Sequence, residues 1–149
     1  MRLEDEIQSK FRNEAQKARL NIRFTDSYLH GKMQSMMKSF GLTGQQYNIL
    51  RILRGQKTNA ATVGLIKERM LDRNSDVSRI LDRLVAKKLI ERREGSIDRR
   101  QKELRITADG LDLVAKMDQP EEDLDNLLHN LSSKEIEQLN HLLDKIRDN

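Results

Sequence analysis

The stretch NSDVSRILDRLVAKKLIERREGSIDRRQKELRITADG, residues 74–110, decides the fold. Apolar residues in its first half recur at helical spacing, at positions Val77, Ile80, Leu81, Leu84 and Val85. We expect these side chains to form the buried face of one helix. In the second half Leu104 and Ile106 alternate with charged residues, and Gly95 begins a polar connection, as in a β-hairpin. The stretch therefore predicts a helix followed by a two-stranded hairpin.

A second short helix is expected just before this stretch. The segment TVGLIKERML, residues 62–71, is joined to it by a polar turn around Asp72 and Arg73. The face of the later helix opposite its apolar side carries small polar and charged residues: Ser75, Ser78, Arg79, Asp82 and Arg83. This layout is that of a helix-turn-helix. An ordinary helical hairpin with a charged solvent face is the alternative.

The hairpin tip favours the helix-turn-helix. It holds Arg99 and Arg100, and a hairpin that directly follows a recognition helix is a wing. The planar, permanently charged guanidinium suits contacts with phosphate and with a narrow minor groove. Asp98 can pair with Arg100 and orient it.

These pieces, in this order, resemble the winged helix-turn-helix of the MarR family of bacterial transcriptional regulators. The matching segments are Val77–Arg79, LVAKKLI, the Asp98–Arg100 motif and ITADG, and a weaker resemblance covers nearly the whole chain. It implies a mainly α fold with a small β-wing. Lys88 is a departure, because the family often has Gly at the end of the recognition helix, and it leaves the geometry of that turn open.

The resemblance implies roles for individual residues. Ser75, Ser78 and Arg79 would meet base edges in the major groove, with Arg79 able to pair with guanine. Thr62 and Arg73, near helix starts, would hold the DNA backbone. A plain capping role is the alternative for Thr62.

In the wing, the resemblance assigns the adjacent minor groove to Arg100. Asp98 would be the carboxylate that supports it, and Arg99 would contact phosphate.

The flanking segments, residues 1–40 and 107–149, are expected to dimerise around a DNA-binding lobe of residues 41–106, all within one MarR-like chain of residues 1–149. An apolar stripe predicts a long helix over residues 5–40, with a break or kink at Gly31. Thr43 and Gln46 form a capping box that starts the next helix.

The C-terminal segment carries similar signals. Thr107 is a good N-cap, and Pro120 predicts a kink or a restart in the helix that follows. Further stripes are predicted at Leu124, Leu127, Leu128 and Leu131, and at Ile136, Leu139, Leu142, Leu143 and Ile146. Ser132 and Glu135 form a second capping box before the last stripe.

In the family, the first and last helices of two subunits interlock, and we expect the same homodimer here. The alternative is that these helices fold back on their own subunit. A twofold dimer would need a pseudo-palindromic operator with half-sites about 34 to 36 Å apart.

Charge is unevenly distributed. Residues 1–61 hold 11 Lys/Arg against 5 Asp/Glu, residues 62–106 hold 13 against 8, and residues 107–149 hold 4 against 11. A basic front and an acidic tail favour a polyanionic partner for the front, although solvated helix faces give similar runs. We expect a cytoplasmic protein without membrane contact, because no apolar run is long enough to span a bilayer.

Many family members bind a small phenolic or carboxylate effector, for which Tyr28, Phe40 and Tyr47 are candidate pocket residues; a core role is the alternative for these aromatics. No cofactor or metal is expected, since the chain has no cysteine and its three histidines are scattered.

The function expected from these features is that of a DNA-binding transcriptional repressor. An enzyme is not expected, because no nucleophile motif and no glycine-rich phosphate loop is found. Two alternatives stay open, a sequence-indifferent nucleic-acid binder and a winged helix used for protein contacts.

Overall fold

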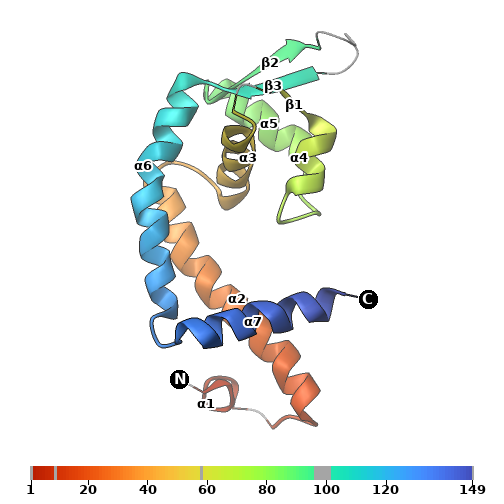
Figure 1. Cartoon of the computed structure of the whole chain (residues 1–149), viewed down its shortest axis with the longest axis vertical. Helices are drawn as coiled ribbons and strands as arrows, with labels where there is room; N and C mark the ends of the chain where they lie inside the picture. Colours follow the sequence, from red (N-terminus) through yellow and green to blue (C-terminus); the bar gives the residue numbers. More distant parts are fainter. Residues whose placement is uncertain (1, 9, 58, 96–101, 149) are drawn as a thin grey trace. The chain divides into compact units, whose positions relative to one another are not determined.

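The chain folds mainly into helices, with one small antiparallel sheet (Figure 1). The computed structural model describes residues 2–8, 10–57, 59–95 and 102–148. In chain order the elements are α1 (Leu3–Ile7), α2 (Glu14–Ser39), α3 (Gly44–Gly55), β1 (Ala61–Thr62), α4 (Val63–Arg69), α5 (Val77–Ala86), β2 (Ile90–Glu94), β3 (Lys102–Ile106), α6 (Ala108–Asp125), the 3₁₀ helix η1 (Asn126–Leu128) and α7 (Ser133–Arg147). Two compact units, Met1–Met117 and Asp118–Asn149, meet inside α6.

The sheet has the strand order β1-β3-β2. The predicted hairpin is confirmed, since β2 pairs with β3 in a register that sets Ile90 opposite Ile106. The short strand β1 was not expected. It pairs with β3 through Ala61 and Leu104, both fully buried, and so joins the start of α4 to the hairpin.

The core of the first unit is built from helices on one side of this sheet. Its fully or almost fully buried side chains include Ile49, Leu50 and Leu53 of α3, Ile66 of α4, Leu81 and Leu84 of α5, and Val114 and Met117 of α6. From the sheet, Leu104 of β3 is fully buried in the same core. The mainly α fold with a β-wing is confirmed.

The N-terminal helix differs from the prediction. The helix expected over residues 5–40 is two helices, because α1 ends at Gln8 in a left-handed conformation and Asn13 caps α2, accepting a hydrogen bond from the Gln16 N–H at 2.8 Å. The break expected at Gly31 is wrong, since α2 runs through it. A glycine costs a helix interior only about 1 kcal/mol relative to alanine, too little to interrupt 26 residues.

The capping signal predicted at the start of α3 is confirmed, and the turn after α5, which the sequence left open, has a regular geometry. The capping box of Thr43 and Gln46 is present. Just after the C-terminal end of α5, Lys88 adopts a left-handed φ of 59°. The Leu89 N–H donates to the Leu84 carbonyl at 3.1 Å and the Lys88 N–H to the Val85 carbonyl at 2.8 Å, which is a Schellman motif. The turn therefore keeps its geometry with lysine in place of glycine.

One residue of the buried face predicted for α5, Val85, is exposed. Val85 is 36% exposed, whereas Val77, Ile80, Leu81 and Leu84 are buried. The helix ends one residue after Val85, so this side chain extends past the packed part of the face.

The segment after the sheet begins as predicted and continues differently. The Thr107 hydroxyl accepts from the Gly110 N–H at 3.1 Å, so Thr107 caps α6. A restart at Pro120 is wrong, because α6 continues through it to Asp125. The leucines predicted as the next stripe are divided between α6, η1 and the turn before α7, so they do not share one helix. The second capping box, Ser132 with Glu135, is present at the start of α7.

Candidate nucleic-acid interface

The N-terminus of α5 presents polar side chains to solvent. Asp76 is its N-cap, with Oδ1 accepting from the Arg79 N–H at 3.1 Å. Ser78 and Arg79 are exposed, and Arg83 follows one turn later on the same face. The opposite face is held in the core by Leu81 and Leu84, so the orientation of the exposed face is fixed by packing.

The turn before α5 is ordered by side chains. The Asp72 carboxylate accepts from the Asn74 N–H at 3.0 Å, the Ser75 hydroxyl at 2.9 Å and the Gln45 amide at 3.1 Å. These donors, that of Gln45 first, lower the pKa of Asp72 because they stabilise its charged form. Arg73 is exposed in this turn. Ser75 also lies in the turn, half-buried, so its expected position on the helix face is wrong: the helix begins after its cap at Asp76.

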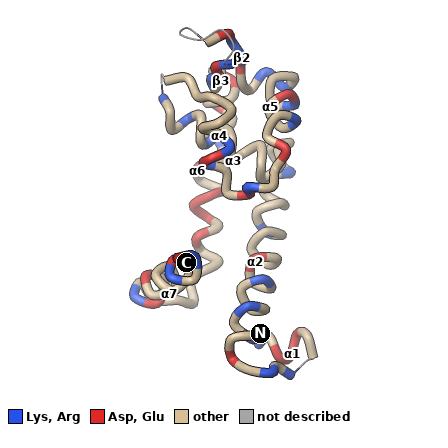
Figure 2. The backbone as a smooth tube through the Cα atoms, turned by 90° about the vertical axis from the view of Figure 1, so that its right-hand side faces the viewer, with Lys and Arg blue, Asp and Glu red and all other residues tan. Residues whose placement is uncertain are grey.

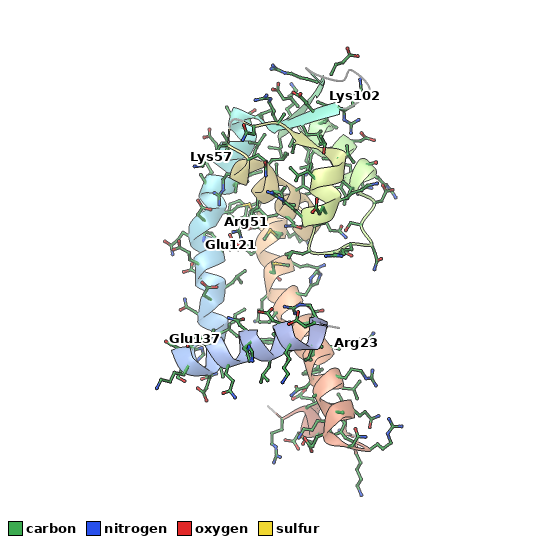
Figure 3. All side chains as sticks on the ribbon, turned by 45° about the vertical axis from the view of Figure 1, so that its right-hand side comes forward. Arg23, Arg51, Lys57, Lys102, Glu121 and Glu137 are labelled. Carbon is green, nitrogen blue, oxygen red and sulfur yellow. The ribbon has the colours of Figure 1, made fainter. Side chains whose placement is uncertain are left out.

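The wing strands carry alternating charges. Arg93 pairs with Glu91 at 3.0 Å, and Lys102, at the start of β3 in Figure 3, pairs with Glu94 at 3.5 Å. The wing residues Asp98, Arg99 and Arg100 lie outside the described residues.

Thr62 has a structural role in the lobe. It is the N-cap of α4, and its hydroxyl accepts from the Leu65 N–H at 3.2 Å. The capping role considered for this residue is therefore present.

The two units differ in their balance of basic and acidic residues. In Figure 2 basic residues recur along α2 and around α5 and the wing strands, and acidic residues gather on the second half of α6. Residues 118–149 hold 9 Asp/Glu against 3 Lys/Arg, including Glu121 and Glu137 in Figure 3. The basic elements of the first unit are thus the ones suited to a polyanion.

Comparisons with known proteins agree with this arrangement. Residues 40–101 match the model of the MarR family. Among solved structures, a mutant MarR from Escherichia coli complexed with operator DNA is 25% identical, with a TM-score of 0.81 over 93% of this chain and 99% of that one. The chain is therefore similar to MarR-family regulators, through the family match over residues 40–101 and through the fold of nearly the whole chain.

Two other MarR-family neighbours have similar folds. The MepR–DNA complex from Staphylococcus aureus is 26% identical, with a TM-score of 0.78 over 85% of this chain and 93% of that one. BpsR from Bordetella bronchiseptica, described for regulation of its DNA binding by 6-hydroxynicotinic acid, is 24% identical, with a TM-score of 0.78 over 89% and 99%. No curated protein matches the sequence.

The first unit also contains cavities. One of about 510 Å³ is lined by Lys38, Gly41, Leu42, Thr43, Gln46, Arg83, Ala86 and Lys87. Lys87 donates from Nζ to the Gly41 carbonyl, which joins the end of α5 to the end of α2.

The three aromatic residues expected at an effector pocket do not line this cavity. Tyr28 is 49% exposed on α2, and Phe40, at the end of α2, lies about 18 Å further along by helical rise. Tyr47 is 4% exposed in the core. Phe40 packs against that core, so within one chain Tyr28 lies apart from the other two.

Sequence reasoning missed several residues that order the exposed surface of α5 and the turn before it. Asp76 caps α5, Gln45 and Asn48 reach the turn from α3, and Arg92 pairs with Asp82 at 3.0 Å. Only the turn had a local signal, since an Asp in a polar turn can accept from the backbone N–H two residues later, as in an Asx-turn. Within the described residues no group of His, Asp and Glu could hold a metal, and no helix is apolar and long enough to cross a membrane.

Proposed function

We propose that this chain is a cytoplasmic transcriptional repressor that binds double-stranded DNA with sequence specificity, as a homodimer on a pseudo-palindromic operator. In this proposal Ser78 and Arg79 contact base edges, and Ser75 supports them from the turn. Thr62 and Arg73 contact the DNA backbone. Arg99 and Arg100, with Asp98 beside Arg100, act from the wing.

The observation that carries the proposal is the exposed face of α5. Ser78, Arg79 and Arg83 stand on the solvent side of a helix whose other side is buried, immediately after a short ordered turn. A helix of this kind fits the major groove, where an arginine can donate two hydrogen bonds to guanine. Similarity to MarR and MepR, whose structures contain DNA, supports the same use of the face.

The test is selection of preferred duplexes from a random pool by the purified protein. Near-physiological salt is needed, because at low salt phosphate attraction dominates. We expect a twofold-symmetric motif whose half-sites are about one helical turn apart. A pool without an enriched motif would contradict the proposal and favour an indifferent binder or a protein-contact module. Placed in a reporter promoter, the selected motif should lower expression when the protein is present.

Apolar residues left exposed on the terminal helices support dimerisation by residues 1–40 and 107–149. On α7, Leu139, Leu142 and Ile146 are 39%, 48% and 58% exposed and recur on one helical face. On α2, Ile22 is 42% exposed. A second copy of the chain would remove such stripes from water.

A small phenolic or carboxylate effector would release the DNA. The cavity beside Lys38, Arg83 and Lys87 has the volume of a small-molecule site and three cations that suit a carboxylate. It lies at the end of the α5 helix, so a ligand there would act on the reading face. The regulation of BpsR by a hydroxylated aromatic acid supports this ligand class.

Salicylate is a direct probe of this effector class. At increasing concentrations it should raise the melting temperature of the protein and release the selected duplex, and Lys38→Met should weaken both effects. 2-Hydroxybenzyl alcohol, which keeps the ring and the phenolic hydroxyl but has a neutral hydroxymethyl group in place of the carboxylate, is the matched control. Equal effects of both compounds would contradict a carboxylate site. The aromatic candidates Tyr28, Phe40 and Tyr47 would instead be supported if Tyr28→Ala, and not Lys38→Met, removed the response.

A further inference from the structure

Two side chains of α3 hold the turn between α4 and α5, which Figure 1 shows as the loop joining these helices. Asn48 Oδ1 accepts from the Leu71 N–H at 3.0 Å, and Gln45 Nε2 donates to Asp72 Oδ2 at 3.1 Å. We call Gln45, Asn48, Asp72 and Ser75 the turn clamp.

Asp72 is the centre of the turn clamp, because its carboxylate accepts three hydrogen bonds, two from within the turn and one from α3. Oδ1 accepts from the Asn74 N–H, and Oδ2 accepts from both the Ser75 hydroxyl and the Gln45 amide. The first two bonds shape the turn, and the third connects the turn to a different helix. Replacing this carboxylate therefore affects both the shape and the attachment of the turn.

Between the buried residues Met70 and Val77, the turn has no buried apolar side chain. Leu71 is 89% exposed, and the residues from Asp72 to Asn74 are exposed as well. In contrast, α3 is fixed in the core by Ile49 and Leu50, both fully buried. The turn clamp thus transfers the rigidity of α3 to an otherwise solvated segment.

The ordered backbone continues directly into α5. The Val77 N–H donates to the Ser75 carbonyl at 2.9 Å, and Asp76 then caps the helix through the Arg79 N–H. Only four residues, the last of them the N-cap Asp76, separate Asp72 from the buried Val77, so the position of Asp72 constrains how the first turn of α5 begins.

We propose that Asp72 is a positioning residue for DNA recognition, which through the turn clamp holds Arg73 and the first turn of α5 where Ser78 and Arg79 can meet base edges. This inference rests on the proposed function. Hydrogen bonds to base edges depend on the position of the side chain, whereas attraction to phosphates is less directional. Loss of the clamp therefore lowers the preference for the operator more than it lowers affinity for DNA in general.

The experiment uses polarity exchange within the full-length protein. Gln45→Glu sets a carboxylate against the Asp72 carboxylate and so opens the clamp by repulsion. The double variant Gln45→Glu/Asp72→Asn restores a donor–acceptor pair in the reverse direction and has the net charge of the wild type. Asp72→Ala removes all three hydrogen bonds. Glu68→Ala, an exposed residue on α4, is the control for loss of one negative charge.

The readout is the ratio of affinities for the selected operator and for a scrambled duplex of equal length. We expect Gln45→Glu and Asp72→Ala to lower this ratio by about tenfold, the order of one good base contact. The double variant should recover most of it, and Glu68→Ala should keep it. A purely structural role would reduce the folded fraction, and with it both affinities equally, so it would leave the ratio unchanged.

Two outcomes would overturn the inference, and they are distinguishable. If the wild type prefers its operator and both Gln45→Glu and Asp72→Ala keep the wild-type ratio, Asp72 has no positioning role although the proposed function stands. A wild type that shows no preference for any duplex overturns the proposed function, and the positioning role falls with it.

Discussion

Arg92 Nη2 lies 3.0 Å from Asp82 Oδ1, so an ion pair connects strand β2 of the wing with the exposed face of α5. The two side chains are 34% and 66% exposed, and a pair this accessible contributes at most about 1 kcal/mol to stability. The pair is of interest because it connects two elements: Arg92 lies within β2 of the wing, and Asp82 lies on α5 one turn after Ser78, which is proposed to read DNA.

The strength of this pair can be measured by a double-mutant cycle. We expect Asp82→Asn and Arg92→Gln each to change the free energy of unfolding by less than about 1 kcal/mol, with a coupling energy of a few tenths. The coupling should shrink as salt rises, because the pair is open to solvent. Urea denaturation at low and high ionic strength provides the values. A coupling above about 2 kcal/mol, or one insensitive to salt, would contradict a solvent-screened pair.

Gly110 is a glycine whose replacement would meet fixed backbone. A Cβ there would lie 2.2 Å from the Leu89 carbonyl oxygen and 2.7 Å from Ile106 Cγ1. We expect Gly110→Ala to destabilise the protein by about 3 kcal/mol, because α6 must move away from the base of the wing. Gly64→Ala is the matched control, since its nearest neighbour would be 3.7 Å away. Equal melting temperatures for the two variants would refute the close approach.

Lys88 offers a stabilising change. Its φ of 59° is strained for lysine and natural for glycine, while its carbonyl accepts from the Thr107 hydroxyl at 2.8 Å in either case. We expect Lys88→Gly to raise the free energy of unfolding by about 0.5 to 1 kcal/mol, after allowing for the greater freedom of glycine in the unfolded chain. Lys87→Gly should lower it, since Lys87 is right-handed and bonds to Gly41. Loss of stability in Lys88→Gly would show that the lysine side chain outweighs the strain.

The proposed dimer predicts a concentration-dependent response to a charge on α7. Leu142→Asp introduces a carboxylate into the exposed apolar stripe and should shift the protein toward monomer and weaken operator binding. Asn140→Asp adds the same charge at an exposed polar position and should leave the association unchanged. Sedimentation velocity over a range of protein concentrations separates the two states. A wild type that sediments as a monomer at the concentration where it binds its operator would argue against the dimer.

Local signals explain which parts of the fold could be predicted. The capping boxes at Thr43 and Ser132 need only residues three apart, and the stripe on α5 needs only one helical face. The helices do not end at Gly31 or Pro120, because a helix propagates cooperatively through one unfavourable residue when its neighbours favour it. Strand β1 has two residues and is defined by its pairing with β3, so no local pattern could indicate it.

The candidate site also has residues that local signals predict and residues that they do not. Exposure of Ser78 and Arg79 follows from the helical period, and the structure agrees. The contact between Gln45 and Asp72 joins residues 27 apart in the chain, and it exists only because α3 packs beside the turn. Ser75 was assigned to the helix face because the pattern marks the helical period and not the cap residue, Asp76, that ends the turn.

The central claim is that α5 reads base edges, and Arg79 tests it most directly. After an operator has been selected, affinities of the wild type and Arg79→Ala are measured for it and for every single-base-pair variant at near-physiological salt. The account predicts that Arg79→Ala loses about 1 to 3 kcal/mol on the operator and becomes indifferent at one symmetric base-pair position. By contrast, Arg100→Ala should weaken binding to most duplexes. An equal loss for Arg79→Ala on every duplex, with all base preferences kept, would contradict base reading by α5.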